Sequence, residues 1–561
     1  MKTINKIGFL KKSLLALAIG SSLVMTSAHA QVTTVFYILL ENRNWTENET
    51  GGGQQVLGSS AAPYLNSLVT PGNPNAAQVS YCSCYHNVLA TPSGSNPSIH
   101  PSEPNYVWME SGSNLSKADD NDPYGSGGSV DQIFNFVNAN PTLTGENLSA
   151  LMQRAGVSWK SYSEGTNLLN TNGQNFNTAG GTLSNTPAAP SQWTVPLVSF
   201  SGTSNSYVNP YNGTHQFNFA CKHTGQLFFP ETNGSGVNAA NQTTSNVAAS
   251  HYPPLEQLQN DLNNNTVANY NVITPDQFND MHTALSGNFT YNGVTYTSGD
   301  SKQVAQGDNF CSIIVPRIMN SPVYKAGHAA IFIWTDETEG SNQNDFNHTL
   351  TEIVISPLCK GNAYNSTLNF THSSDVATMQ KIFGLVANTP TGFLNDAANF
   401  SNSSNGQVGV SQIAGAHSWS TAFTQAASPT GGFGTGTAQD MSDLFVSGTI
   451  PANIPGLNLA ASGYSFNRRT GTYTQTVTVS NTLSTAITAP VYLVVGGLSN
   501  NATLANSAGT TVNNDAGSPY VLVSQSGLGA GASTTVTLTY TPPTTGTISA
   551  TMDVVATSAQ P

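Results

Sequence analysis

The sequence predicts an α/β domain with a central, mostly parallel sheet flanked by helices, followed by an immunoglobulin-like β-sandwich. In the first two-thirds of the chain, short apolar runs alternate with amphipathic helical patterns, which is typical of a largely parallel sheet. Beyond residue 460, short segments such as 473–479 and 533–540 alternate strictly between polar and apolar residues. We therefore expect an α/β domain over residues 31–452 and a sandwich over residues 460–561.

Residues 1–30 have the pattern of a cleaved export signal. Four lysines, at positions 2, 6, 11 and 12, precede a mostly apolar segment, and residues 28–30 read Ala-His-Ala, a small-x-small cleavage pattern. The apolar segment is shorter than the roughly 20 residues of a transmembrane helix, and no later run approaches that length. We therefore expect a secreted or periplasmic protein whose mature chain begins near Gln31.

The acidic charge balance argues against nucleic-acid binding. The chain has 16 Lys and Arg against 29 Asp and Glu, and removal of the four signal lysines changes the net charge from −13 to −17. Affinity for nucleic acid rests on basic residues that neutralise phosphates. We therefore expect no nucleic-acid partner, while the sequence leaves the oligomeric state open.

Five cysteines allow two disulfides and one leftover thiol in an oxidising compartment. Cys82 and Cys84 have a strand-like spacing that makes their mutual pairing awkward, so each would need a distant partner. A cysteine-based zinc site would need a second close pair, which the sequence lacks. The disulfide pairing therefore stays open.

Apolar, β-branched runs predict the strands of the sheet; they span residues 32–40, 270–273, 329–334 and 352–355. The first run stops at Glu41-Asn42, the third stops shortly before Asp336-Glu337, and the second leads toward Asp280. In open α/β sheets, ligands bind beyond the carboxyl ends of the strands. We therefore expect these side chains to converge on one site.

Helical patterns lie between the runs, at residues 61–69, 146–155, 309–320 and 374–386. His372 opens the last of these helices. Ser373 or Ser374 is a natural N-cap there, and Asp375 favours the positive end of a helix.

Ser102 lies in the segment 100–106, which reads His-Pro-Ser-Glu-Pro-Asn-Tyr. Two prolines restrict the backbone around it, and an apolar stretch begins at Tyr106. If that stretch is a helix, Ser102 lies near the N-terminus, where free N–H groups and the helix dipole favour a phosphoryl oxygen. The alternative is an ordinary proline-rich turn with an N-cap.

Adjacent acids at the end of a strand suggest a metal ion. Asp336 and Glu337 have no basic residue nearby in the sequence and would repel each other without a cation. A divalent metal would remove this repulsion and would activate a coordinated hydroxyl. A solvated acidic loop is the alternative, because Glu339 follows.

Short motifs occur in order over roughly residues 32 to 450. They are Glu41-Asn42-Arg43-Asn44-Trp45, Ala62-Pro63-Tyr64-Leu65-Asn66, the segment around Ser102, Ser158-Trp159-Lys160-Ser161-Tyr162, Lys222-His223, Asn279-Asp280-Met281-His282, Gly307-Asp308, Asp336-Glu337, Ser356-Pro357 and His372-Ser373-Ser374. Together they resemble the phosphoesterase family of bacterial acid phosphatases and non-haemolytic phospholipases C, within the alkaline-phosphatase-like superfamily.

The resemblance implies roles for individual residues. Ser102 resembles the metal-coordinated nucleophile, and Asn105 the side chain that holds a phosphoryl oxygen. The implied ligands of a divalent metal, zinc or another, are Glu41, Asn42, Ser102, Asp336, Glu337 and Asp280. Asn42, Lys222 and His223 match phosphate-pocket positions, and His372 or His282 would protonate the leaving alcohol.

The resemblance also implies a mechanism in which Ser102 attacks phosphorus, forms a phosphoserine, and is released by water. An acid-phosphatase-like phosphomonoesterase is the first expectation. A phospholipase C cleaving phosphatidylcholine-type lipids is the alternative, with peripheral membrane contact left open and with Trp45, Trp108, Trp159 and Tyr162 as candidates for a choline cage. A non-catalytic surface-binding protein is the third hypothesis.

Overall fold

The structure is a computed structural model. It describes residues 31–46, 55–85, 101–112, 120, 122–123, 146–169, 182–195, 197, 199–229, 231–233, 247–339, 349–368, 370–385, 387, 394, 440–447, 449–450, 457–481, 486–487, 490–496, 498–499, 502–511, 518–541, 548, 550 and 551–556. The predicted export signal and His100 lie outside these residues. Among the described residues, no helix is both long and apolar enough to cross a membrane.

A seven-stranded sheet forms the centre of the α/β part. Its order is β15 (Tyr364–Ser366), β3 (Val79–Cys82), β14 (Glu352–Ile355), β12 (Ala329–Thr335), β1 (Thr34–Leu40), β9 (Tyr270–Thr274) and β4 (Trp159–Ser163). All strands run in one direction except β14, which is antiparallel to both β12 and β3. The predicted mostly parallel sheet is therefore confirmed, and all four predicted strands belong to it.

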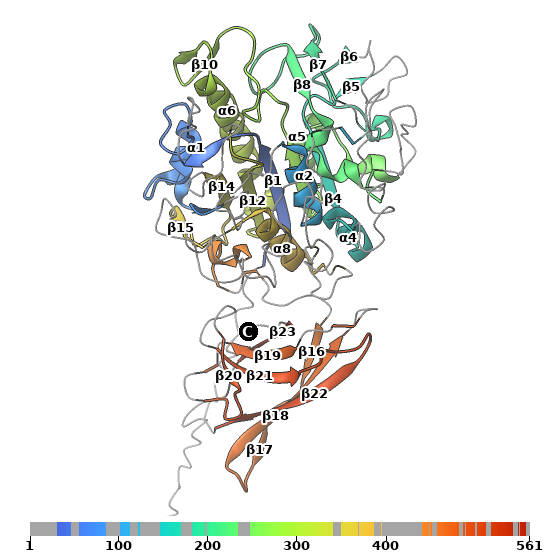
Figure 1. Ribbon diagram of the computed structural model, residues 1–561, viewed down its shortest axis with the longest axis vertical. Coiled ribbons are helices and arrows are strands. Elements are labelled where there is room, and N and C mark those ends of the chain that lie inside the picture. Colours follow the sequence, from blue (N-terminus) through green and yellow to red (C-terminus); the bar gives the residue numbers. More distant parts are fainter. Residues whose placement is uncertain are drawn as a thin grey trace, which may run out of the picture.

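Helices cover both faces of this sheet, which explains why its strands are apolar on both sides. Along β1, Val35, Tyr37 and Leu39 belong to one hydrophobic cluster, whereas Phe36, Ile38 and Leu40 belong to another. The first cluster includes side chains of α2 (Glu103–Ser111), α4 (Leu148–Ala155) and α8 (His372–Phe383). The second includes side chains of α1 (Pro63–Leu68), α5 (Glu256–Asn264) and α6 (Asp300–Met319). Figure 1 shows these helices around the sheet.

The helix predicted at residues 309–320 begins earlier, at Asp300. The sequence obscured this start because Gly307 and Asp308 interrupt the apolar pattern. Both are needed for packing: a Cβ at Gly307 would collide with the Met281 side chain, and the Asp308 carboxylate accepts hydrogen bonds from the main-chain N–H groups of Tyr64 and Leu65. Asp308 thereby satisfies free donors at the start of α1.

The N-cap of α8 differs from the prediction. Thr371 caps the helix, because its hydroxyl accepts from the Ser373 N–H, while the Ser374 hydroxyl accepts from the Thr371 N–H at 3.1 Å. Ser374 therefore completes a capping box, and neither Ser373 nor Ser374 is the N-cap. Asp375 lies in the first turn, as predicted.

All five cysteines are free and buried, so the disulfides that the sequence allowed do not form in this structure. Cys82, Cys84, Cys221 and Cys359 pack in one of the two hydrophobic clusters and Cys311 packs in the other. The cysteines therefore act here as small apolar core residues.

The C-terminal region forms two four-stranded antiparallel sheets (orange and red in Figure 1). One contains β16 (Leu457–Ala461), β17 (Ser465–Asn467), β18 (Thr472–Asn481) and β22 (Ser533–Tyr540); the other contains β19 (Val491–Gly496), β20 (Gly509–Thr510), β21 (Pro519–Ser524) and β23 (Thr551–Ala556). Side chains of both sheets, such as Val477 and Leu493, share one hydrophobic cluster. The immunoglobulin-type assignment stays a prediction.

Short elements connect the main ones. They are β2 (Asn44–Thr46), β5 (Leu168–Leu169), β6 (Thr182–Leu183), β7 (Phe200–Thr203), β8 (Gln216–Phe219), β10 (Phe289–Tyr291), β11 (Val294–Tyr296), β13 (Thr349–Leu350), α7 (Pro322–Lys325) and the 3-10 turns η1 (Pro74–Ala76), η2 (Pro190–Gln192), η3 (Cys221–His223), η4 (Gly225–Phe228), η6 (Val247–His251) and η9 (Met441–Leu444).

Candidate active site

The acids predicted at the strand ends lie together at one edge of the sheet. Glu41 follows β1, and Asp336 and Glu337 follow β12, its parallel neighbour. The Glu41 N–H donates to the main-chain oxygen of Asp280 at 2.7 Å, which ties the segment after β9 to the same edge. All four side chains are buried, with at most 2% of each residue exposed.

Asn42 turns the chain into this cluster. It adopts a left-handed backbone conformation, with φ at 40°, which asparagine tolerates better than most residues. Its N–H donates to Asp336 Oδ1 at 2.9 Å. The backbone turn at Asn42 therefore fixes the Asp336 carboxylate and brings the Asn42 amide beside Ser102.

Ser102 is the N-cap residue of α2 and is buried. Its Oγ lies 3.0 Å from Glu41 Oε2, 3.0 Å from Glu337 Oε1 and 3.5 Å from Asn42 Oδ1. Of the two alternatives that the sequence left open here, a helix or a proline-rich turn, the structure has the helix, so the hydroxyl lies where free N–H groups and the helix dipole favour negative charge.

Two contacts fix the position of α2. The Trp108 indole N–H donates to the Ser373 hydroxyl at 2.7 Å, which anchors α2 to α8. Gly225 packs against the other side of the helix, where a Cβ would collide with the main-chain oxygen of Tyr106. The close approach of η4 to α2 therefore requires glycine at position 225.

The acidic cluster fits a divalent metal. Glu41, Asp336 and Glu337 each offer a carboxylate oxygen, and these oxygens lie within 4.8 Å of one another. Burial, and then the charge of Glu337, raise the pKa of Glu41 to about 8, and burial together with Glu41 and Glu337 also raises the pKa of Asp336. A cation would offset both the burial and the repulsion.

The orientation of the Asn42 amide is a second, independent indication that a cation binds at the acidic cluster. Without a cation, its neighbours are satisfied only if the amide nitrogen donates to Glu41 Oε2 at 3.0 Å and to Glu337 Oε1 at 2.8 Å. With a cation among these carboxylates, the same position suits the amide oxygen, since hard divalent cations prefer oxygen ligands. The donor set of Glu41, Asn42, Asp336, Glu337 and Ser102 therefore fits the metal that the resemblance implies.

Polar groups surround the cluster on the side of α2 and η3. Asn105 Nδ2 lies 3.4 Å from Glu337 Oε2, and His223 Nε2 lies 3.3 Å from Glu41 Oε1. Lys222 forms an ion pair with Asp120, and although burial opposes the charged form, this partner raises the pKa of the Lys222 amine. These groups bring positive charge and amide donors to the edge of the acidic cluster.

Asp280 and His282 lie beside the three-acid cluster. The Asp280 carboxylate is 3.8 Å from His223 Nδ1 and accepts from the His282 N–H at 2.8 Å. The His282 ring bonds to the Thr283 hydroxyl through Nδ1, and burial, Lys222 and Arg43 lower the pKa of His282 to about 4. His282 Nε2 makes no hydrogen bond with the described residues.

Both ring nitrogens of His372 make hydrogen bonds next to the acidic cluster. Nε2 lies 2.6 Å from the main-chain oxygen of Asp336, so it carries the proton and donates. Nδ1 lies 2.7 Å from the Tyr85 hydroxyl and 3.1 Å from the Trp334 indole nitrogen. Burial lowers the pKa of His372 to about 3, so the ring is neutral and supports the Asp336 main chain.

Tyr106 was not singled out by sequence reasoning, although it lies four positions after Ser102 and thus one helical turn further along. Its hydroxyl donates to Glu41 Oε1, and its ring stacks on His223 with centroids 4.8 Å apart. The spacing could have revealed this contact. The Tyr85 and Trp334 contacts with His372 carried no local sequence signal.

Three comparisons relate the chain to known proteins. No curated protein matches the chain. Similar solved structures include a protein of the alkaline phosphatase superfamily from Vibrio parahaemolyticus, with 8% identity, a TM-score of 0.34, and coverage of 80% of this chain and 77% of that chain. Others are Ps i-CgsB (10%, TM-score 0.34, coverage 64% and 73%) and a glycosaminoglycan-metabolism protein of Bacteroides thetaiotaomicron (9%, TM-score 0.30, coverage 80% and 87%). The Phosphoesterase family model matches residues 96–386, more than half of the chain, and the chain therefore belongs to the Phosphoesterase family.

Proposed function

We propose that the chain is a secreted, metal-dependent phosphomonoesterase that works through a phosphoserine at Ser102. The observation that carries this proposal is the position of Ser102 Oγ, 3.0 Å from both Glu41 Oε2 and Glu337 Oε1 at the start of α2. A metal-coordinated nucleophile needs such neighbours. Family membership supports the phosphate ester as the bond that is cleaved, and the export pattern of residues 1–30 supports secretion.

In this mechanism Ser102 Oγ attacks phosphorus in line with the leaving alcohol. The bond from phosphorus to the alcohol oxygen breaks, and a phosphoserine forms. A divalent cation, when bound, lowers the pKa of the Ser102 hydroxyl and neutralises charge on the phosphate. The N–H groups at the start of α2 and the Asn105 amide suit the phosphoryl oxygens. Water then hydrolyses the phosphoserine and releases phosphate.

The leaving oxygen needs a hydrogen-bond donor as its bond to phosphorus breaks, and we assign this role to His282 rather than to His372. The lowered pKa of His282 keeps its ring neutral, so the proton that the alcohol finally gains comes from water. Both ring nitrogens of His372 are occupied by Asp336, Tyr85 and Trp334. His282 uses only Nδ1 for a hydrogen bond among the described residues. We therefore propose that His372 positions Asp336 and that His282 Nε2 serves the leaving group.

The choice of a phosphomonoester over a choline lipid rests on the aromatic residues. Trp45 packs edge-on against Tyr81, Trp108 bonds to Ser373, and Trp159 stacks on His251. Tyr162 donates to Asp261 and is fully buried. These side chains serve the core, so they do not support a choline cage, and we propose no membrane contact.

The test is an activity assay on the purified mature chain. The substrates are p-nitrophenyl phosphate, p-nitrophenylphosphorylcholine and phosphatidylcholine vesicles, each with and without a chelator. We expect hydrolysis of the monoester, loss with chelator and in Ser102→Ala, and full activity in the matched control Ser312→Ala, which alters a hydroxyl on α6. Activity confined to the choline substrates favours the phospholipase C alternative. Turnover insensitive to chelator and to Ser102→Ala overturns the mechanism, and no turnover at all favours the non-catalytic hypothesis.

A further inference from the structure

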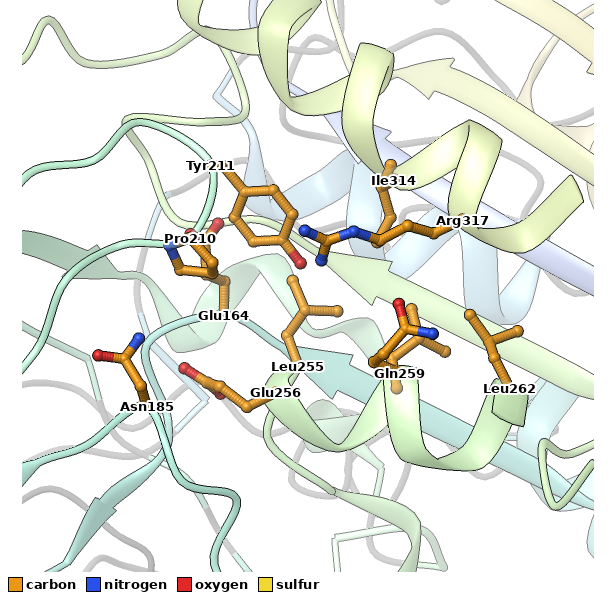
Figure 2. Close-up of a pocket in the computed structure, with 11 residues that line it drawn as sticks. Glu164, Asn185, Pro210, Tyr211, Leu255, Glu256, Gln259, Leu262, Ile314 and Arg317 are labelled. Carbon is orange, nitrogen blue, oxygen red and sulfur yellow. The ribbon is translucent and has the colours of Figure 1, made fainter. Parts of the chain in front are cut away.

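A cavity of about 210 Å³ lies between α5, α6 and the segment around Tyr211, and it shares no lining residue with the acidic cluster (Figure 2). Its walls are largely aliphatic, with charged groups at only three positions. The aliphatic residues are Pro210, Leu255, Leu258, Leu262 and Ile314, and the charged ones are Glu164, Glu256 and Arg317. The volume is below the usual range for drug-sized ligands, roughly 300 to 1,000 Å³, so an occupant would be small.

Glu256 lines this cavity and has a carboxylate that no other residue satisfies. It is the first residue of α5, both carboxylate oxygens are buried, and among the described residues only its own main-chain N–H contacts the carboxylate. Burial, and then the charge of Glu164, raise the pKa of Glu256 to about 8. A buried carboxyl group without a partner is costly, and such groups call for a binding role or a bound molecule.

Glu164, the other acid, is satisfied by the protein itself. Its Oε1 accepts from the side-chain amides of Asn209 and Asn279, each at 2.7 Å, and its Oε2 accepts from the Asp276 N–H at 2.9 Å. Glu164 therefore orders its own surroundings, and Glu256 is the acid that is available to a ligand.

Arg317 supplies the opposite charge. Its guanidinium lies over the Tyr211 ring, 5.4 Å from the centroid, and among the described residues it has no ion pair or hydrogen bond. Figure 2 shows the guanidinium beside Tyr211 and the Glu256 carboxylate lying apart from it across the cavity. A guanidinium matches a carboxylate or phosphate through two parallel hydrogen bonds.

We infer that this cavity binds a small zwitterion, with a cationic amine on the Glu256 carboxylate and a carboxylate or phosphate on the Arg317 guanidinium. The aliphatic walls suit a short alkyl chain between the two charges. The Gln259, Leu262 and Arg317 side chains also line an adjoining hollow of about 300 Å³, which gives the cavity a neighbouring space on the Arg317 side. The inference is independent of the phosphatase proposal.

Binding should be linked to proton release, because a cation favours the ionised form of Glu256. The titratable groups that act on or respond to Glu256 are Glu164, which opposes its ionisation, and the hydroxyls of Tyr207 and Tyr211, and Arg317 lines the same cavity. Burial raises the pKa of both tyrosines well above their ordinary value, so they stay neutral. Glu256 is therefore the group expected to release the proton.

The test is calorimetric titration of full-length mature Ser102→Ala, in which phosphate-ester turnover plays no part. The probes are glycine, 4-aminobutyrate, 6-aminohexanoate and O-phosphoethanolamine, with butylamine and butyrate as singly charged analogues. We expect one zwitterion to bind at least about tenfold more tightly than either analogue. The preferred chain length then measures the span between the two charges, and the comparison with O-phosphoethanolamine distinguishes a carboxylate from a phosphate ligand.

Two variants test which residue binds which end of the zwitterion. Glu256→Gln should weaken zwitterion binding at least about tenfold without affecting butyrate, and Arg317→Gln should weaken zwitterion binding without affecting butylamine. Glu231→Gln and Arg154→Gln, from an exposed ion pair, are the matched controls and should change nothing. A further titration uses the protein with Glu256 and Arg317 intact, in two buffers of different ionisation enthalpy. A difference in the binding heat between the buffers should show proton release, and this result does not depend on whether the variants fold.

Three results would overturn the inference: no binding by any probe, equal affinity for zwitterions and singly charged analogues, or unchanged affinity in a folded Glu256→Gln variant. These binding measurements do not depend on the proposed phosphatase activity, because the titrated protein already carries Ser102→Ala.

Discussion

The Tyr106 hydroxyl donates a hydrogen bond to Glu41 Oε1, and the Tyr106 ring stacks on His223. One side chain of α2 thereby orients a carboxylate that follows β1. Removal of the hydroxyl in Tyr106→Phe should lower metal affinity by about 10- to 100-fold, as is typical when a partner of a metal ligand is lost. The measurement is activity as a function of metal concentration.

The matched control for this variant is Tyr252→Phe. It also removes a buried hydroxyl, one that donates to the main-chain oxygen of Thr232 at 2.9 Å, away from the acids. Metal affinity should not change in this control. Equal effects of the two substitutions would show that Tyr106 contributes only to folding stability.

His372→Asn should lower turnover by roughly 10- to 100-fold. The substitution removes the hydrogen bond to the main-chain oxygen of Asp336, and a small displacement of Asp336 should lower the reaction rate. The loss should be the same for p-nitrophenyl phosphate and phenyl phosphate, whose leaving groups differ in basicity. His251→Asn, which loses a comparable bond to the Trp159 main chain, is the control. A larger loss with phenyl phosphate would make His372 a proton donor.

A divalent cation should raise the thermal midpoint of the mature chain, by an amount equivalent to about 2.7 kcal/mol when the metal is at 100 times its dissociation constant. Glu337→Gln removes one of the three clustered carboxylates and should abolish most of this gain. Glu231→Gln, at an exposed site, should retain it. An equal gain in both variants would place the metal elsewhere.

Glu256 should make the apo protein less stable as pH rises. Its pKa is raised from an ordinary 4.5 to about 8 in the folded state, so between these values the folded state holds a proton that the unfolded state releases. Stability is therefore lost as pH rises through this window, by about 1.4 kcal/mol for each unit of pKa difference. Glu256→Gln should be more stable than the parent at pH about 8 and should lose that advantage near pH about 5.

Denaturant unfolding at several pH values measures this difference. Other buried carboxyl groups with raised pKa values, among them Glu41, Glu110 and Glu164, should leave a pH dependence in both proteins, so the test is the difference between parent and variant. A difference between parent and variant that is independent of pH would contradict the account.

The sequence predicted the sheet and the convergence of the acids because both follow from local patterns. Each apolar run identified a strand, and the parallel pairing of β1 with β12 places Glu41 beside Asp336 and Glu337. The prolines and the apolar stretch around Ser102 left both a turn and a helix start open, and the structure decided between them. The family resemblance then supplied the chemical roles, which periodicity does not encode.

Other features depend on contacts between distant segments and had no local signal. The direction of β14 is set by its pairing with β12 and β3. The early start of α6 is hidden by Asp308, whose carboxylate serves another helix. The roles of Tyr85 and Trp334 under His372 join residues far apart in the chain.

The steric course at phosphorus tests the central claim, covalent catalysis by Ser102, most directly. The measurement uses a phosphate monoester made chiral at phosphorus with oxygen isotopes, with transfer to an acceptor alcohol. Each in-line displacement inverts the configuration, so attack by Ser102 followed by attack of the acceptor predicts overall retention. Overall inversion would mean that the acceptor attacks the substrate directly, and it would contradict the phosphoserine mechanism.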